Sequence, residues 1–355
     1  MENSTKVNTQ SHPFRAFANR SSQAVSVGQP TSARRALCAV SIGLAAAALS
    51  LTLSVSDFDQ LWFAGNAVRA GTDPYAVLHG SFWHDLYYPL TAVVVAIPTT
   101  VLPRVEAHAL FAGLGMAAAA YAVSSMGWWA LIGLASYPAL NAVQLAQWSP
   151  YFVAAALIPY LDWLLLVKPT TGAATVAAFA FDRPARALAL SALVSSALIG
   201  ASFLVEPDWP ARWFSATRSA VHIAAPFVRP AGFILLAALL RWRLPEARLL
   251  ALLCVLPQTM APYEALLLIL ALRSRREALV FALSSYAMLP FLSTVEKAGS
   301  LAQRIQHDAP VLLLFLYLPV LIMVLRRPNV GRVPDRVERM ATILPEWLRG
   351  VRALP

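Results

Sequence analysis

Long apolar segments alternate with short polar ones along most of this chain. About 20 apolar residues are enough to cross a bilayer as a helix. Runs near or somewhat below that length occupy residues 36–55, 88–102, 107–124, 128–146, 151–167, 188–205, 279–292 and 311–325. The pattern predicts an all-α integral membrane bundle with about ten to twelve transmembrane or re-entrant helices.

Three further apolar segments are short or broken. Residues 172–181 and 230–240 are brief apolar pieces. Residues 249–272 contain Pro257 and Pro262, and a proline inside a helix removes a backbone hydrogen bond and clashes with the preceding turn. We therefore expect 249–272 to form two short or re-entrant segments.

The two ends of the chain differ from its middle. Residues 1–35 are polar and rich in Ser, Thr and Gln, which is typical of a disordered tail. We expect a membrane domain over residues 36–326, with the first span retained as a signal anchor, and a basic tail over residues 327–355.

Composition agrees with a membrane protein. Hydrophobic residues make up 58% of the chain and charged residues 13%, whereas soluble domains have about 25% charged residues. The mean hydropathy is +0.60. Cys38 and Cys254 lie in apolar runs with no Cys or His at ligand spacing, so neither a disulfide framework nor a thiolate metal site is expected.

The basic residues predict the orientation, because Lys and Arg concentrate on the cytoplasmic side. With both tails inside and alternating spans, 21 of the 28 basic residues fall on the inner side. The outer side receives Arg69, Lys168, Arg212, Arg218, Arg229, Lys297 and Arg304. We expect a multi-pass protein of the bacterial inner membrane with both termini cytoplasmic. Attraction of Arg to the anionic inner leaflet explains the formal charge of +10, so no nucleic-acid partner is expected.

The longest polar interruption, residues 57–89, then lies on the extracytoplasmic side. Its acids are Asp57, Asp59, Asp73 and Asp85, and its only Lys or Arg is Arg69. It also carries Trp and Tyr residues, which settle at membrane interfaces. The composition predicts a structured loop on the membrane surface, with an interfacial helix over about 57–70 and carboxylates at the boundary.

Two other acids, Asp162 and Glu264, fall inside apolar segments, toward what we expect to be their outer ends. An ionisable group in a span is costly and therefore suggests function. Pairing with a neighbouring Arg or Tyr for helix packing is the alternative for both. The chain contains no zinc spacing, phosphate loop, dinucleotide fingerprint or GxSxG elbow, so no cofactor is expected.

Four short elements together resemble a known enzyme family. They are Asp57-Phe58-x-x-x-Trp62-x-Ala64, Ala70-Gly71-x-Asp73-Pro74-Tyr75, Tyr88-Pro89 and Lys168-Pro169-Thr170. Their order and spacing over about residues 36–172 resemble the multispan α-mannosyltransferases of glycosyltransferase family 87, in the GT-C superfamily. The chain departs from the family pattern at Leu90, where Pro is common, and at Ala146, where Gly usually precedes Gln147.

The resemblance implies a reaction. Such enzymes transfer a sugar, usually mannose, from a polyprenyl-phosphate donor to a hydroxyl of a glycan or glycolipid acceptor, with inversion. That transfer needs a carboxylate base and a cation for the departing phosphate. Asp57 matches the family's catalytic Asp, although it could instead be a helix N-cap. Asp59 is the rival base, and on a helix the two side chains would not share a face.

The remaining candidates concern substrate binding. Lys168 could hold the donor phosphate as a point charge, or could be a snorkelling anchor at the end of a span. The other candidates are Glu264, Tyr88, Gln147, Arg218 and His84. For Arg218 a solvated loop face is the alternative, and for His84 a position at the membrane interface. The family resemblance implies no metal.

Two other functions compete with transfer. A transporter or flippase of a lipid-linked sugar would also have broken helices and intramembrane acids. Such a protein would place its ionisable groups near the midplane and show paired halves, whereas most acids here lie in outer loops. An inactive membrane scaffold is the third possibility.

Overall fold

The computed structural model describes residues 31–52, 56–78, 85–220, 223–292 and 301–331, together with residues 333, 334, 337 and 339. Within these residues every regular element is a helix, as the sequence predicts. Strand-like pairing in the described part is an isolated bridge, in which the backbones of Ala224 and Gln258 exchange hydrogen bonds.

The helices differ in length and in type. The α-helices are α2 (Ser32–Ser50), α3 (Phe58–Arg69), α4 (Leu90–Ala96), α5 (Arg104–Val123), α6 (Tyr137–Gln144), α7 (Ser149–Leu157), α8 (Pro169–Phe179), α9 (Ala185–Val205), α10 (Trp209–Ser219), α11 (Pro245–Val255), α12 (Arg275–Ala287), α14 (Leu301–Leu312) and α15 (Leu318–Leu325). The longer 3₁₀ segments are η1 (Ile97–Val101), η3 (Trp128–Ala135), η4 (Pro159–Leu166), η7 (Gly232–Arg241) and η8 (Pro262–Ala271). Several apolar stretches are therefore built from two short helices.

Four helical stretches in the described part are long and apolar enough to cross a membrane. They are Ser32–Ser50, Arg104–Met126, Ala185–Val205 and Ala302–Leu325. These stretches suggest a multi-pass membrane protein.

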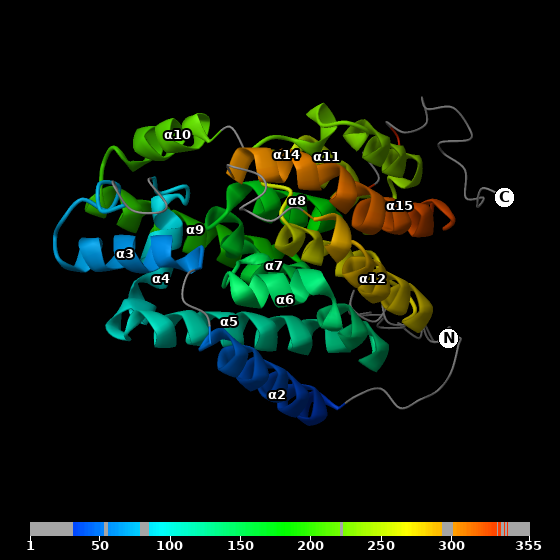
Figure 1. Cartoon of the computed structure of the whole chain (residues 1–355), viewed down its shortest axis with the longest axis horizontal. Helices are drawn as coiled ribbons and strands as arrows, with labels where there is room; N and C mark the ends of the chain where they lie inside the picture. The colour runs from blue at the N-terminus through cyan, green and yellow to red at the C-terminus, as the bar shows by residue number, and fades with distance from the viewer. Residues whose placement is uncertain are drawn as a thin grey trace, which may run out of the picture.

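The bundle has two distinct ends. In Figure 1, α3 and α10 lie at the left, while α2 begins and α15 ends farther to the right. We call these the loop end and the terminal end. The Arg35 guanidinium near the start of α2 donates to the carbonyl oxygen of Tyr121 and to Oγ of Ser124, at the far end of α5. Helices α2 and α5 are therefore antiparallel and join the two ends.

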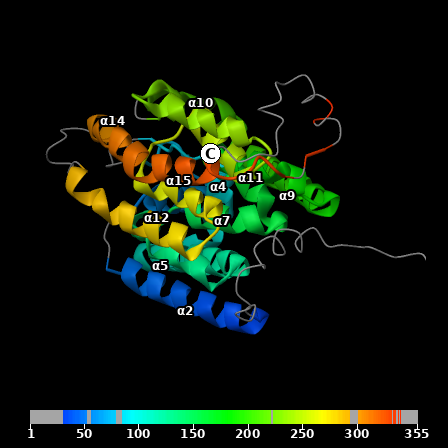
Figure 2. The same cartoon turned by 90° about the vertical axis from the view of Figure 1, so that its right-hand side faces the viewer.

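Small residues allow α2 and α5 to pack closely. A Cβ added at Gly43 would lie 2.8 Å from the carbonyl oxygen of Gly113, and a Cβ at Gly113 would lie 2.9 Å from that of Gly43. Figure 2 shows the two helices side by side along the lower edge of the bundle. Close approach of this kind is how apolar helices gain contact where burial from water contributes little.

The prediction that residues 88–102 and 107–124 are two successive spans is wrong. The N–H of Tyr87 donates to the Gln60 side chain, and Arg69 donates to the Thr100 carbonyl, so both ends of α4–η1 contact α3. Arg104, expected on the inner side, forms an ion pair with Asp59 at 2.8 Å. Residues 88–102 thus return to the loop end, and only α5 crosses to the terminal end.

The polar loop expected at residues 293–308 is helical from Leu301 onward, within the residues that the structure describes. Pro310 lies inside α14, and a π-helical turn, η10 (Leu313–Tyr317), joins α14 to α15. A proline removes one helical hydrogen bond, and the wider turn accommodates the interruption without ending the helix. The predicted break within 249–272 is confirmed, because α11 ends at Val255 and η8 begins at Pro262.

Helix α7 and segment η4 form a hairpin that starts and ends at the loop end. Asp162, near the start of η4, forms an ion pair with Arg183 at 2.8 Å. Arg183 follows the far end of α8 and also donates to the carbonyls of Ala155 and Ala156. Asp162 therefore lies toward the terminal end, not toward Lys168 as expected. The expected alternative for Asp162, pairing with an Arg, is confirmed.

Candidate functional site

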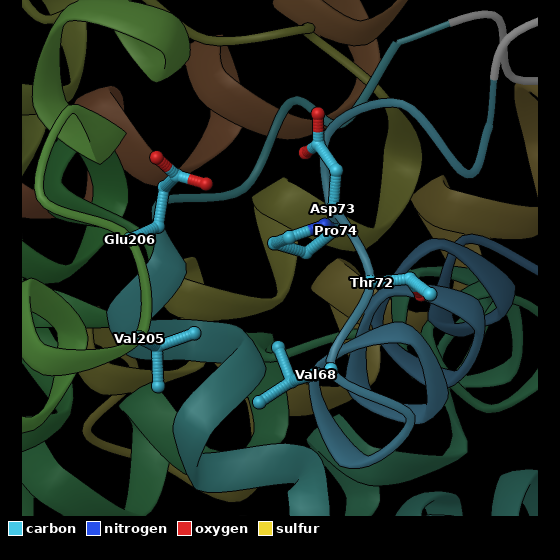
Figure 3. Close-up of a pocket in the computed structure, with 7 residues that line it drawn as sticks. Val68, Thr72, Asp73, Pro74, Val205 and Glu206 are labelled. Atoms are coloured by element: carbon cyan, nitrogen blue, oxygen red, sulfur yellow. The ribbon is translucent and has the colours of Figure 1, made fainter.

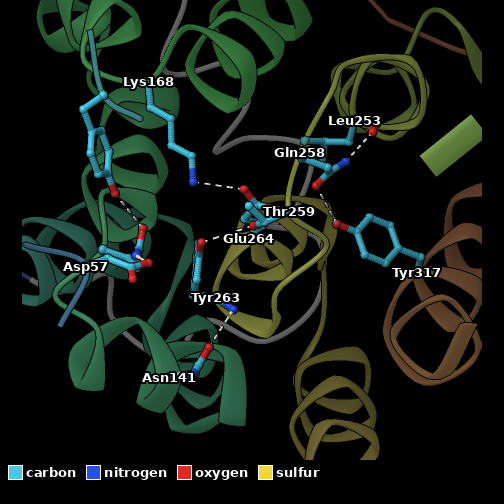
Figure 4. A network of polar contacts seen from close by, with 11 residues as sticks. Asp57, Asn141, Lys168, Leu253, Gln258, Thr259, Tyr263, Glu264 and Tyr317 are labelled. Carbon is cyan, nitrogen blue, oxygen red and sulfur yellow. Dashed lines mark hydrogen bonds and ion pairs between the residues drawn. The ribbon is translucent and has the colours of Figure 1, made fainter. Parts of the chain in front are cut away.

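Six polar side chains from five segments meet at the loop end of the bundle. We call this group the Asp57 cluster; it consists of Asp57, Tyr88, Gln147, Lys168, Tyr263 and Glu264. Figure 4 shows Asp57, Lys168, Tyr263 and Glu264 pointing toward one another from different parts of the fold. The cluster brings together four of the six expected substrate-binding residues and one of the two expected bases.

Asp57 occupies the N-cap position of α3 but makes no capping hydrogen bond. Its Oδ2 instead accepts a hydrogen bond from the side-chain amide of Gln147. Withdrawal of the carboxylate from water raises the pKa of Asp57 to about 6, and the Glu264 charge adds to the rise, while Lys168 and the Gln147 hydrogen bond oppose it. The group remains mostly ionised at neutral pH and is a stronger base than an exposed aspartate.

Gln147 is directed at Asp57 by an unusual turn after α6. Ala146 has φ +43°, in the left-handed region that favours glycine, and the N–H of Gln147 donates to the Ala142 carbonyl at 2.9 Å. Ala146 therefore adopts a backbone conformation that glycine reaches more easily than alanine does. Gln147 also lies 3.5 Å from the Tyr88 hydroxyl through its Oε1, so it joins Asp57 to Tyr88.

Lys168 and Glu264 form the second half of the cluster. The Lys168 Nζ lies 2.9 Å from Glu264 Oε1 and 5.0 Å from the centre of the Tyr263 ring. Each residue lies where a helical segment begins: Lys168 precedes α8, and Glu264 is in the first turn of η8. The Glu264 side chain is 1% exposed, and a buried carboxylate of this kind requires a cation.

The sequence did not indicate several residues that support the Asp57 cluster. The N–H of Tyr263 donates to the Asn141 side chain at 3.3 Å, and the Tyr263 hydroxyl lies 3.2 Å from the Thr259 hydroxyl. The Tyr317 hydroxyl donates to Gln258, on the loop before η8. Isolated polar side chains such as Asn141 and Gln258 in apolar stretches are the sequence signal that could have identified these contacts.

Asp59, the rival base, has different partners. Its carboxylate pairs with Arg104 and accepts the Ser56 N–H at 3.3 Å. Asp59 is 4% exposed. The expectation that Asp57 and Asp59 point in different directions is confirmed, and Asp59 anchors α3 to the start of α5.

The other two expected binding residues are not placed in the cluster. Arg218 is exposed on α10, with its guanidinium 5.3 Å from the centre of the Phe214 ring. His84 lies outside the described residues. Among the described residues, Arg218 therefore has no contact with Asp57.

A separate cavity of about 300 Å³ lies at the other end of α3 from Asp57 (Figure 3). Its lining residues are Val68, Gly71, Thr72, Asp73, Pro74, Val205 and Glu206. Arg212 on α10 bridges Asp73 at 2.6 Å and Glu206 at 3.2 Å. Helix α3 has 12 residues, or about 18 Å of length, so this cavity is distinct from the Asp57 cluster.

Neither a family model, nor a curated protein, nor a solved structure matches this chain. The function is therefore argued from the chemistry of the Asp57 cluster. The resemblance of its residues to family 87 remains an expectation from the sequence.

Proposed function

We propose that this protein is a membrane glycosyltransferase that moves a sugar from a polyprenyl-phosphate donor to an acceptor hydroxyl, with inversion. The observation that carries the proposal is the Asp57 cluster, where a carboxylate of raised pKa and a Lys168 ammonium lie within one electrostatically coupled group. Inverting transfer requires such a base and such a cation.

Asp57 is the base in this proposal. The acceptor oxygen forms a bond to the anomeric carbon, the bond from that carbon to the phosphate oxygen breaks, and the acceptor proton passes to Asp57. Gln147 holds Oδ2, which leaves Oδ1 to face the acceptor hydroxyl. Asp59 is a poor rival because Arg104 and the Ser56 N–H already engage its carboxylate.

Lys168 receives the leaving phosphate. Its charge acts on Asp57, and it would stabilise the negative charge that develops on the departing polyprenyl phosphate. Arg229, whose charge acts on Glu264 from the turn before η7, adds positive potential on the same side. No divalent ion is required in this scheme.

The proposed topology follows from the two ends of the bundle. The loop end, with α3 and α10, faces the extracytoplasmic side, and the terminal end, with both tails, faces the cytoplasm. The short helices α6, α8, α11 and α12 and the 3₁₀ segments η7 and η8 complete further crossings between the four long ones, while α7–η4 is re-entrant. We propose that this arrangement is a GT-C-type bundle in which a lipid-borne donor can reach Asp57.

The family resemblance supplies the identity of the substrates. We propose mannose as the sugar and a glycan or glycolipid as the acceptor. A direct test incubates purified protein with polyprenyl-phosphate mannose and a membrane glycolipid extract, and measures free polyprenyl phosphate and mannosylated lipid. Formation of both products supports the transferase. Movement of intact donor across proteoliposomes, without cleavage, would instead identify a flippase.

A further inference from the structure

Glu264 has one carboxylate oxygen that the described structure leaves without a hydrogen-bond partner. Its Oε1 pairs with Lys168, whereas Oε2 is buried and accepts no hydrogen bond. A buried acceptor without a donor carries a desolvation cost that a ligand donor would remove. The ion pair with Lys168 satisfies one of the two carboxylate oxygens and leaves the other without a donor.

The neighbouring groups restrict what can donate to Oε2. Asp57 is an acceptor when ionised, and the Tyr263 hydroxyl already faces the Thr259 hydroxyl. Arg229, whose charge acts on Glu264, forms no hydrogen bond with Oε2. A phosphate oxygen is excluded because two anions would repel one another. The fitting partner is a neutral hydroxyl, of which a sugar carries several.

We propose that Glu264 Oε2 accepts a hydrogen bond from a hydroxyl of the transferred sugar. Lys168 then binds the donor's phosphate, and Glu264 binds the sugar next to it. This inference rests on the proposed function. The Lys168 ammonium and the Glu264 carboxylate are 2.9 Å apart, so the hydroxyl they select lies next to the phosphate. On a glycosyl phosphate that hydroxyl is the one on the carbon beside the anomeric centre, the 2-hydroxyl.

The position of this hydroxyl gives the contact a role in the reaction as well as in recognition. Hydrogen bonds to a sugar 2-hydroxyl strengthen as positive charge develops at the anomeric carbon. A carboxylate acceptor makes a stronger hydrogen bond than a neutral one. Glu264 is therefore a substrate-contacting residue whose loss lowers kcat as well as donor affinity.

The test compares polyprenyl-phosphate mannose with its 2-deoxy analogue in wild type, Glu264→Gln and Glu206→Gln. Glu206 is the matched control, because it pairs with Arg212 at the separate cavity. In wild type we expect the 2-deoxy donor to lose on the order of 10- to 100-fold in kcat/KM. In Glu264→Gln that penalty should be smaller by about 3- to 10-fold, and in Glu206→Gln it should be unchanged.

The other possible outcomes either overturn this inference or support it. An undiminished 2-deoxy penalty in Glu264→Gln, with normal transfer by wild type, overturns this inference and leaves the proposed function standing. Transfer from neither donor by wild type overturns both. If Glu264→Gln fails to fold, wild type alone decides: equal losses with the 2-deoxy and 6-deoxy donors contradict the inference, and a selective 2-deoxy loss supports it.

Discussion

The side-chain amide of Gln147 donates a hydrogen bond to the carboxylate of Asp57, a residue 90 positions earlier in the chain. The contact fixes one oxygen of the carboxylate and leaves the other available. It also favours the ionised form, because a hydrogen-bond donor stabilises the negative charge. Gln147 thus both orients the proposed base and keeps its pKa from rising further.

Replacing Gln147 with Leu should move the acid limb of the pH–rate profile upward. Wild-type kcat/KM should fall as pH drops through about 6, where Asp57 becomes protonated. Removal of the hydrogen bond raises the pKa of Asp57, so the loss of activity begins at a higher pH. The measurement is kcat/KM against pH. Gln144→Leu, one turn earlier at the end of α6, is the control. If both variants have the same acid limb, the Gln147 hydrogen bond does not set the pKa of Asp57.

Removing Lys168 should weaken donor use and also destabilise the protein. Lys168→Ala leaves Glu264 buried without its cation, which costs on the order of 3–5 kcal/mol for a buried pair. The double variant Lys168→Met with Glu264→Gln should recover much of the stability but retain a raised KM for the donor.

Thermal unfolding in detergent and donor KM are the two measurements for this pair. Arg212→Ala breaks two more exposed ion pairs, with Asp73 and Glu206, and should change stability by no more than about 1 kcal/mol. An unchanged donor KM in Lys168→Ala would return Lys168 to the role of snorkelling anchor.

Residues near position 103 should be accessible from the same side as the acidic loop. Single cysteines at Pro103 and Thr72, in a background lacking Cys38 and Cys254, should both be labelled from outside the cell. A cysteine at Arg276, in the first turn of α12 at the terminal end, should be labelled only from inside. If Pro103→Cys and Arg276→Cys are labelled from the same side, residues 88–102 must cross the membrane after all.

Local sequence signals predicted much of the fold. Tryptophan, tyrosine and aspartate in one polar segment predicted a helix over about 57–70, and the structure has a helix at Phe58–Arg69. Pro257 and Pro262 predicted the break between α11 and η8. Both predictions depend on the chemistry of neighbouring residues, and tertiary contacts did not override them.

Contacts between distant segments could not be predicted in this way. Residues 88–102 are apolar enough for a span, and hydropathy does not reveal that Trp62 donates to the Leu102 carbonyl or that Asp59 pairs with Arg104. The same limit applies to the site. Asp57, Gln147, Lys168 and Glu264 were named from the sequence, but the pairing of Lys168 with Glu264 joins residues 96 apart.

Asp57→Asn tests whether Asp57 is the base of the transfer reaction. Asn keeps the size of Asp but cannot accept the proton, and Asp57 makes no capping hydrogen bond whose loss could disturb α3. Because a general base contributes typically 10²- to 10⁴-fold, the variant should insert, fold and bind donor yet transfer sugar at least about 10²-fold more slowly. Asp73→Asn, at the separate cavity, should transfer at a rate near wild type. The most direct measurement is the single-turnover rate of sugar transfer from bound donor: a loss of that size in Asp57→Asn is the predicted result, and a near wild-type rate in that variant would contradict the account.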